Sequence, residues 1–166
     1  GTSITGTYGT LTIGADGSYT YVADQSAADD LDAGDTETDV FVYTVSDGTT
    51  SQTANLTITV TGVNDTPTAV DDTDAVNEDA TITKTGSQDD VLNDDTDADD
   101  SASLNVSAIQ PSGGSSSTVS SGTTYSNGTS VTGTYGTLTI GANGSYTYVA
   151  DQAAADALDA SDTATD

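Results

Sequence analysis

Apolar and polar residues alternate along several short stretches of the chain, which predicts β-strands with one buried face. In the clearest stretch, residues 53–61 (TANLTITVT), every second residue is apolar: Ala54, Leu56, Ile58 and Val60. The residues between them are Asn or Thr, so we expect a strand of an antiparallel sheet whose other face lies in water.

Other segments repeat this pattern. Residues 40–45 (VFVYTV) predict a strand with Phe41, Tyr43 and Val45 facing the core. Residues 9–23 predict a hairpin in which Leu11 and Ile13 face Tyr19 and Tyr21 across an Asp16-Gly17 turn. Further strands are expected at 68–72, 80–85, 104–109 and 129–134.

One segment has helical spacing instead. In residues 24–34 (DQSAADDLDAG), Ala27, Ala28 and Leu31 share a helical face, and Gly34 is a C-terminal stop signal. Short strands about eight to twelve residues apart, with turn residues between them, favour a sandwich. The sequence therefore predicts an all-β fold, an antiparallel β-sandwich repeat with one short helix.

The chain contains an internal repeat. Residues 1–39 recur at 128–166, an offset of 127, and only six of the 39 positions differ. Such near-identity indicates recent duplication within a tandem array, so we expect the chain to be part of a longer repetitive protein. A boundary is expected at 62–67 (GVNDTP), where a strand ends and Pro67 cannot donate to a ladder.

This boundary divides the chain into two partial repeats. Residues 1–65 would be the C-terminal part of one repeat, and residues 66–166 the N-terminal part of the next. We expect residues 66–127 to complete the 1–65 part, either in the same chain or from a neighbouring molecule. Exchange between molecules would give head-to-tail self-association of identical repeats.

The composition excludes several functions. The chain has 27 acidic residues, one lysine (Lys84) and no arginine, so its formal net charge is −26. This charge excludes nucleic acid and anionic membrane surfaces as partners, and without a long apolar run we expect no membrane insertion. Only 33% of the residues are apolar. An unfolded acidic linker is the alternative, but the regular strand patterns favour a folded chain.

The acidic residues cluster in loops at the ends of predicted strands. Calcium binds six to eight oxygen ligands, whereas zinc prefers the His and Cys side chains that this chain lacks. We therefore expect Ca²⁺, with smaller octahedral magnesium sites or a merely solvated acidic surface as alternatives. The candidate ligands are Asp35, Asp47, Asn64, Asp65, Asp72, Glu78, Asp79, Asp95, Asp97 and Asp99. The loop from Asp95 is not an EF-hand, because Asp100 and Val106 replace its glycine and glutamate.

A family resemblance follows from the order of these motifs. YTVSDGTTSQTANLTITVTGVNDTP (43–67), followed by VNEDATIT and VLNDDTDADDSASLNVSAI, resembles the cadherin-like repeats of giant bacterial RTX-type surface adhesins. The stretch GTLTIGADGSYTYVAD…DVFVYTVSDG is similar to a VCBS-type repeat. The resemblance implies immunoglobulin-like sandwiches strung end to end outside the bacterial cell, with calcium at or near their junctions.

The same resemblance suggests roles for particular residues. The matching positions are Asp47 in the turn before the last strand, Asn64 and Asp65 in the linker, Glu78 in the next repeat, and the pair Asp97 and Asp99. Cadherin linkers carry a further Asp where this chain has Gly62, and Pro67 comes one residue early. We therefore expect fewer than three ions at each junction.

These features predict a structural function: a calcium-stiffened extender that projects a ligand-binding tip. A calcium-dependent carbohydrate- or ice-binding module is the alternative, because Thr57, Thr59 and Thr61 would form a regular exposed row. An enzyme is not expected, because no His, Cys or Arg is available for acid–base catalysis, nucleophilic attack or oxyanion binding.

Overall fold

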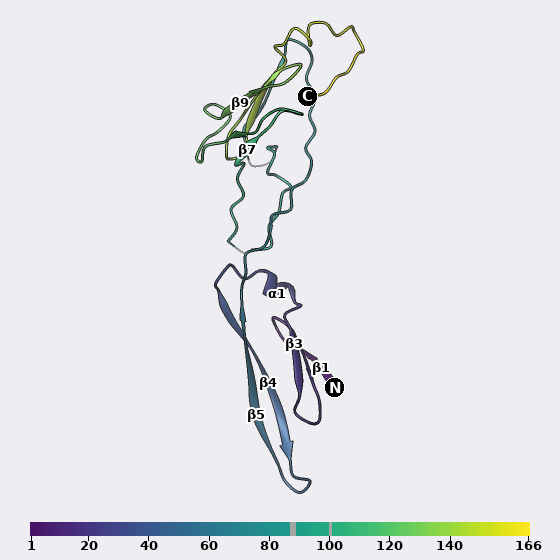
Figure 1. The fold of residues 1–166 in the computed structure, drawn as a ribbon, viewed down its shortest axis with the longest axis vertical. Helices are drawn as coiled ribbons and strands as arrows, with labels where there is room; N and C mark the ends of the chain where they lie inside the picture. The colour runs from purple at the N-terminus through teal and green to yellow at the C-terminus, as the bar shows by residue number, and fades with distance from the viewer. Residues whose placement is uncertain (87–88, 100) are drawn as a thin grey trace. The chain divides into compact units, whose positions relative to one another are not determined.

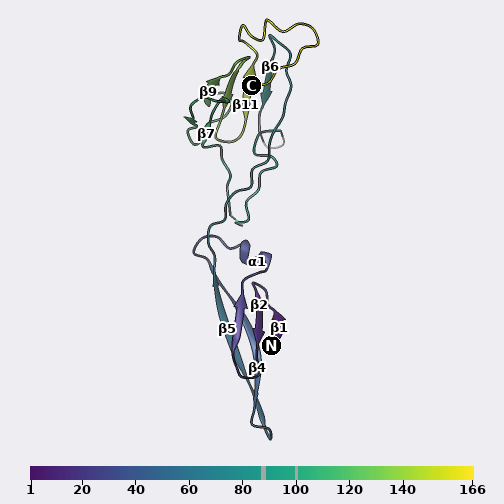
Figure 2. The same cartoon turned by 45° about the vertical axis from the view of Figure 1, so that its right-hand side comes forward.

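The computed structural model describes residues 1–86, 89–99 and 101–166, which form two compact units (Figures 1 and 2). The first unit consists of Gly1–Thr66 with Asp97–Ala102, and the second of Pro67–Thr96 with Ser103–Asp166. Each unit is described separately below. Where repeats begin and end in a longer array stays a prediction.

The first unit contains two antiparallel sheets. Its elements are β1 (Thr2–Thr5), β2 (Thr10–Ile13), β3 (Tyr19–Val22), α1 (Ser26–Asp29), β4 (Thr36–Ser46) and β5 (Ser51–Thr61). Strands β1, β2 and β3 form one sheet in that order, and β4 pairs with β5 to form the other. The predicted hairpin is confirmed, because Leu11 lies opposite Tyr21 and Ile13 opposite Tyr19. The helix predicted within 24–34 is confirmed as the four-residue α1, but it ends at Asp29 with Asp30 as its C-cap, so the predicted helical position of Leu31 and the stop at Gly34 are wrong.

The two sheets of the first unit pack face to face. Leu11 is 1% exposed, and the Tyr21 ring meets the Phe41 ring edge-on, with 6.2 Å between centroids. Of the three residues expected to face the core from β4, only Phe41 is buried. Tyr43 and Val45 are 39% and 58% exposed, so their predicted burial is wrong. They share the Phe41 face, but within this unit the three-stranded sheet does not reach far enough along β4 to cover them.

The second unit contains the second copy of the hairpin. Its strands are β6 (Thr81–Lys84), β7 (Ala108–Ile109), β8 (Ser117–Thr118), β9 (Thr129–Thr132), β10 (Thr137–Ile140) and β11 (Tyr146–Val149). Four strands form an antiparallel sheet in the order β6-β11-β10-β9, and β7 pairs with β8. Val119, Ile140 and Ala142 form the core of this unit. The architecture of both units is therefore antiparallel β, as the alternating pattern predicts.

Some of the strands predicted for the second unit are confirmed, and others are wrong. β6 and β9 confirm the strands expected at 80–85 and 129–134, but only Ala108–Ile109 of the expected 104–109 strand is formed. The strand expected at 68–72 is wrong, because this segment makes a single bridge between Thr68 and Thr96. The Val70 amide instead donates to the Asp95 carboxylate at 2.8 Å. A side chain thus satisfies a backbone group that a strand would have used.

The two hairpin turns allow a matched test of backbone strain. Gly17 and Gly144 have φ of 84° and 82°, in the left-handed region. A Cβ on Gly17 would meet no atom within 4 Å, whereas one on Gly144 would lie 2.9 Å from Leu92 Cγ. We expect Gly17→Ala to cost about 1 kcal/mol of strain, and Gly144→Ala to cost more. Hydrogen exchange of the two hairpins would measure the stability lost in each variant. Equal losses would contradict the close approach of Leu92 to Gly144.

No helix in the described residues is long and apolar enough to cross a bilayer.

Candidate metal centre

A group of carboxylates lies in the loops at one end of the first unit. We call Asp32, Asp65, Asp97 and Asp99 the linker cluster. The Asp65 amide donates to Asp99 Oδ2 at 3.1 Å, and the Asp99 amide donates to Asp97 Oδ1 at 3.0 Å. Asp32 accepts hydrogen bonds from the amide, at 3.2 Å, and from the hydroxyl of Ser101. Segments more than 30 residues apart in sequence are thus joined through carboxylate oxygens.

The alternation of aspartates explains why this loop turns carboxylates inward. Asp97 and Asp99 are partly buried, whereas the intervening Ala98 is exposed. In an extended segment, successive side chains point to opposite sides. Asp-x-Asp therefore places two carboxylates on the same side of the loop.

One carboxylate oxygen of the linker cluster is buried and unsatisfied in the described part of the chain. Asp99 Oδ1 is buried and has no hydrogen-bond partner in the described part of the chain. Leaving such an acceptor unsatisfied costs about 1–3 kcal/mol, and more when the group is charged. A bound hard cation would remove this cost, and the all-oxygen surroundings match the ligands that calcium prefers. The ligand chemistry of the linker cluster therefore fits calcium, but in the described ranges no three of its carboxylates already lie close enough together to hold an ion.

A second acidic group lies in the second unit. We call Asp71, Asp72, Asp90, Asp94 and Asp95 the Asp72 cluster. Partial desolvation and the charges of Asp94, Asp95, Asp90 and Asp71 raise the pKa of Asp72. Asp95 is partly buried, and its Oδ1 accepts the Val70 amide. Like charges thus lie close enough here to interact, and a cation would relieve their repulsion.

Asp47 lies apart from the linker cluster. Its Oδ1 accepts the amides of Thr50 and Thr49 at 2.7 and 2.8 Å, and these bonds lower the pKa of Asp47. The carboxylate therefore closes the turn between β4 and β5. The 11 residues of β4 separate this turn from Asp35, roughly 35 Å away at the usual rise of a strand. Asp47 and the linker cluster therefore cannot bind the same ion.

The remaining candidate ligands are exposed. Asp35 lies in the loop before β4, and the Asn64 side chain donates to the Asp65 carbonyl. Glu78 and Asp79 form the turn before β6, where Asp79 has a φ of 61°. In the described ranges, no three His, Cys, Asp or Glu side chains are arranged so that they could hold an ion. Asp100, examined in the EF-hand comparison, lies outside the described residues.

Sequence reasoning missed the role of Asp39, which anchors the first hairpin. Its carboxylate accepts the amides of Thr7, Tyr8 and Gly9 at 2.8, 3.1 and 3.1 Å, and the Tyr21 hydroxyl at 2.7 Å. Asp39 is 4% exposed. Burial alone would raise the pKa of Asp39, but these four hydrogen bonds outweigh it and hold the pKa below its ordinary value.

The second copy contains the same anchor. Asp166 accepts the amides of Thr134, Tyr135 and Gly136, and the Tyr148 hydroxyl at 2.6 Å. The signal was present in the sequence, because every partner recurs at an offset of 127. Asp39 also alternates with Phe41 on β4, which places its side chain toward the core.

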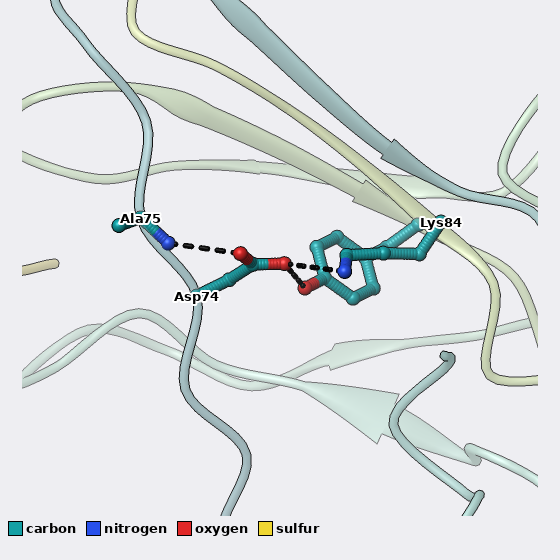
Figure 3. Close-up of polar contacts among 4 residues, drawn as sticks. Asp74, Ala75 and Lys84 are labelled. Atoms are coloured by element: carbon teal, nitrogen blue, oxygen red, sulfur yellow. Dashed lines mark hydrogen bonds and ion pairs between the residues drawn. The ribbon is translucent and has the colours of Figure 1, made fainter. Parts of the chain in front are cut away.

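A third polar contact fixes the segment before β6 (Figure 3). Asp74 Oδ2 lies 3.1 Å from Lys84 Nζ and accepts the Tyr146 hydroxyl at 3.0 Å, and Asp74 Oδ1 accepts the Ala75 amide at 2.9 Å. Lys84 lowers the pKa of Asp74, and burial with this hydrogen bond raises the pKa of Tyr146 to about 12. The chain's one basic side chain thus helps to join β6 to β11.

The comparisons with known proteins identify one similarity. Residues 1–62 match the bacterial cadherin-like domain. The matched stretch contains β1 to β5, including the Asp39 anchor. Domains of this kind are typical of structural, non-catalytic repeats in extracellular regions. No curated protein and no solved structure matches the chain.

Proposed function

We propose that this chain is part of a non-catalytic, calcium-binding extender of an RTX-type adhesin on the bacterial cell surface. Tandem cadherin-like repeats of VCBS type would form a spacer that holds a ligand-binding tip away from the cell. Three findings support the proposal: the match of residues 1–62, the antiparallel β architecture and the near-identical repeat.

The observation that carries calcium binding is the buried, unpartnered Oδ1 of Asp99. Asp99, Asp97 and Asp65 would have to draw together around the ion, with Asp32 beside them. Asp72 and Asp95 would serve a second site in the other unit. When bound, calcium supplies positive charge that neutralises these carboxylates. The chain itself brings Asp99 to Asp65 through the hydrogen bond that the Asp65 amide donates to Asp99 Oδ2.

The position of the linker cluster explains how bound calcium would stiffen the chain between repeats. Asp65 comes four residues after β5 ends at Thr61, in the stretch that leads from one repeat toward the next. An ion shared by Asp65 and Asp99 would restrict the backbone of that stretch. In an array, the same restriction at each junction would convert a flexible string into a rod.

Calcium titration of the full chain tests the proposal. Extracellular calcium modules bind with a Kd of about 10⁻⁴–10⁻³ M, and we expect calorimetry to give a value in this range. Asp99→Asn should weaken the linker site at least tenfold, because it removes the charge at the buried oxygen. Asp47→Asn is the matched control and should leave this site unchanged. Absence of saturable binding at millimolar calcium would refute the proposal.

A second candidate function is supported by the outward face of the β4–β5 hairpin. Thr57, Thr59 and Thr61 are exposed, and Thr38 and Thr36 lie opposite the last two. Two neighbouring rows of threonine would suit a calcium-dependent carbohydrate- or ice-binding surface. Thr59→Tyr would abolish binding to ice or to a glycan array if this face is a binding site, and would leave the spacer function intact.

A further inference from the structure

The glycine that directly follows β5 is bound to the loop between α1 and β4 (residues 30–35), which we call the α1–β4 loop. Gly62 is buried. Its amide donates to the Asp35 carbonyl at 2.9 Å, and its carbonyl accepts the Gly34 amide at 3.1 Å. Both polar groups of the Gly62 backbone thus bind this loop.

No side chain fits at position 62 without moving the loop. A Cβ there would lie 2.5 Å from the Leu31 carbonyl oxygen and 2.8 Å from the Leu31 carbonyl carbon, and it would overlap the Asp32 carbonyl oxygen. These are backbone atoms, so they cannot rotate aside as the end of a long side chain can. The φ of Gly62 lies outside the left-handed region. The close approach of the two backbones is therefore what requires glycine here.

The loop that packs on Gly62 also supplies one carboxylate of the linker cluster. Asp32 accepts the Ser101 amide at 3.2 Å and the Ser101 hydroxyl. Three residues beyond Gly62, the Asp65 amide donates to Asp99 Oδ2 at 3.1 Å. The stretch 62–65 thus contacts both segments that carry the other carboxylates of the cluster: the α1–β4 loop through Gly62, and the segment of Asp97 and Asp99 through Asp65.

We propose that Gly62 is a positioning residue of the linker cluster. Because Gly62 has no side chain, the α1–β4 loop closes onto the end of β5, and this approach holds the Asp32 carboxylate against Ser101. The effect of Gly62 on calcium affinity rests on the proposed function, whereas its effect on the contact between Asp32 and Ser101 does not. Changing a residue that orients metal ligands typically weakens metal binding about 10–100-fold.

The same contact accounts for the difference between this chain and cadherin linkers, which carry an aspartate at this position. The space that the Cβ of an aspartate would need is occupied by the Leu31 and Asp32 carbonyls. An aspartate at position 62 would add one carboxylate to the linker, but it would displace the loop that carries another. The close packing therefore predicts that introducing the residue found in the family weakens the site.

Gly62→Asp tests this prediction directly, with Gly62→Ala as its uncharged counterpart. In calorimetric titration of the full chain with calcium chloride, both variants should raise the Kd of the linker site about tenfold or more. If Gly62→Asp bound calcium as tightly as the native chain, or more tightly, the proposal would be overturned, because the position of the α1–β4 loop would then not limit the affinity.

Gly17→Ala controls for a general loss of stability in the first unit. Gly17 has a φ of 84° and no atom within 4 Å of its Cβ position, so this variant strains a turn without moving the α1–β4 loop. Its Kd for calcium should equal the native value. Should Gly17→Ala weaken binding as much as Gly62→Ala does, the weaker binding would reflect lost stability, and Gly62 would have no positioning role.

Hydrogen exchange of the Ser101 amide, measured without calcium, provides a readout that does not depend on the ion. Gly62→Ala should speed this exchange roughly fivefold or more relative to the native chain and to Gly17→Ala, because the Asp32 acceptor moves away. Unchanged protection of the Ser101 amide would overturn the proposal. A native chain that bound no calcium would refute the proposed function, and the exchange of Ser101 would still decide the role of Gly62.

Discussion

Replacing Asp39 with alanine is expected to unfold the first unit while leaving the second unit folded. The substitution removes the common acceptor of three amides and the Tyr21 hydroxyl, through hydrogen bonds that are buried or partly buried. Each of these donors that is left without an acceptor away from water costs about 1–3 kcal/mol. A small domain has a total stability of about 5–15 kcal/mol, and this unit has a small core. Hydrogen exchange resolved along the chain would detect the loss.

Asp166 provides the matched control for this experiment. It makes the same set of hydrogen bonds in the second copy, but its side chain is exposed. Water can replace the lost acceptor there, so Asp166→Ala should cost about 1 kcal/mol or less. If Asp39→Ala and Asp166→Ala lowered the free energy of unfolding by the same amount, burial of the carboxylate would not determine how strongly it holds the hairpin.

The anchor also predicts how the first unit responds to acid. The folded state lowers the pKa of Asp39, so the carboxylate contributes stability that is fully present above its unfolded pKa of about 3.9. This contribution is lost as the pH falls through the folded-state pKa. We expect the first unit to lose stability below about pH 4, and Asp39→Asn to remove most of that dependence. Hydrogen exchange measured at several pH values, for the native chain and for Asp39→Asn, would check both expectations.

Removal of calcium is expected to have the second large effect. A site occupied at 100 times its Kd adds roughly 2.7 kcal/mol to folding stability. A change of 1 kcal/mol moves the melting temperature of a small domain by about 4–8 °C. Chelation should therefore lower the melting temperature of the first unit by roughly 10–20 °C. Scanning calorimetry with calcium, with magnesium and with a chelator would measure this shift.

Two comparisons make the calcium experiment specific. Magnesium should restore little of the lost stability, because it requires a smaller octahedral arrangement of ligands. In Asp99→Asn, chelation should lower the melting temperature of the first unit by half or less of the shift seen in the native chain, because its linker site binds calcium at least tenfold more weakly. An unchanged melting profile of the native chain after chelation would contradict the proposed function.

The sequence predicted those parts of the fold that local pattern controls. Alternation in residues 53–61 identified β5, and Asp16-Gly17 placed the turn of the first hairpin in its observed register. Tyr43 and Val45 were misassigned because alternation shows which face a residue shares but not how far the covering sheet extends. The 68–72 strand failed because a carboxylate 25 residues away competes for the Val70 amide.

The candidate sites were harder to predict because aspartate has several roles. Asp39, Asp47 and Asp99 have the same side chain, yet one anchors a hairpin, one closes a turn and one has a buried, unpartnered oxygen. Composition identified the acidic loops, and the Asp-x-Asp spacing drew attention to Asp97 and Asp99, where the Asp99 amide donates to Asp97 Oδ1. Only tertiary contacts distinguish ligands from structural carboxylates.

Near-identity of the two hairpins has a consequence for how the chain folds as it leaves the ribosome. Residues 1–39 are synthesised before the β6 segment, and residues 128–166 are synthesised after it. Until residues 128–166 are made, the earlier hairpin is an available match for β6, although β6 pairs with β11 in this structure. Neighbouring modules with such similar sequences can mispair while they are being made. A nascent array of this kind must therefore correct transient pairings between neighbouring repeats before each repeat is complete.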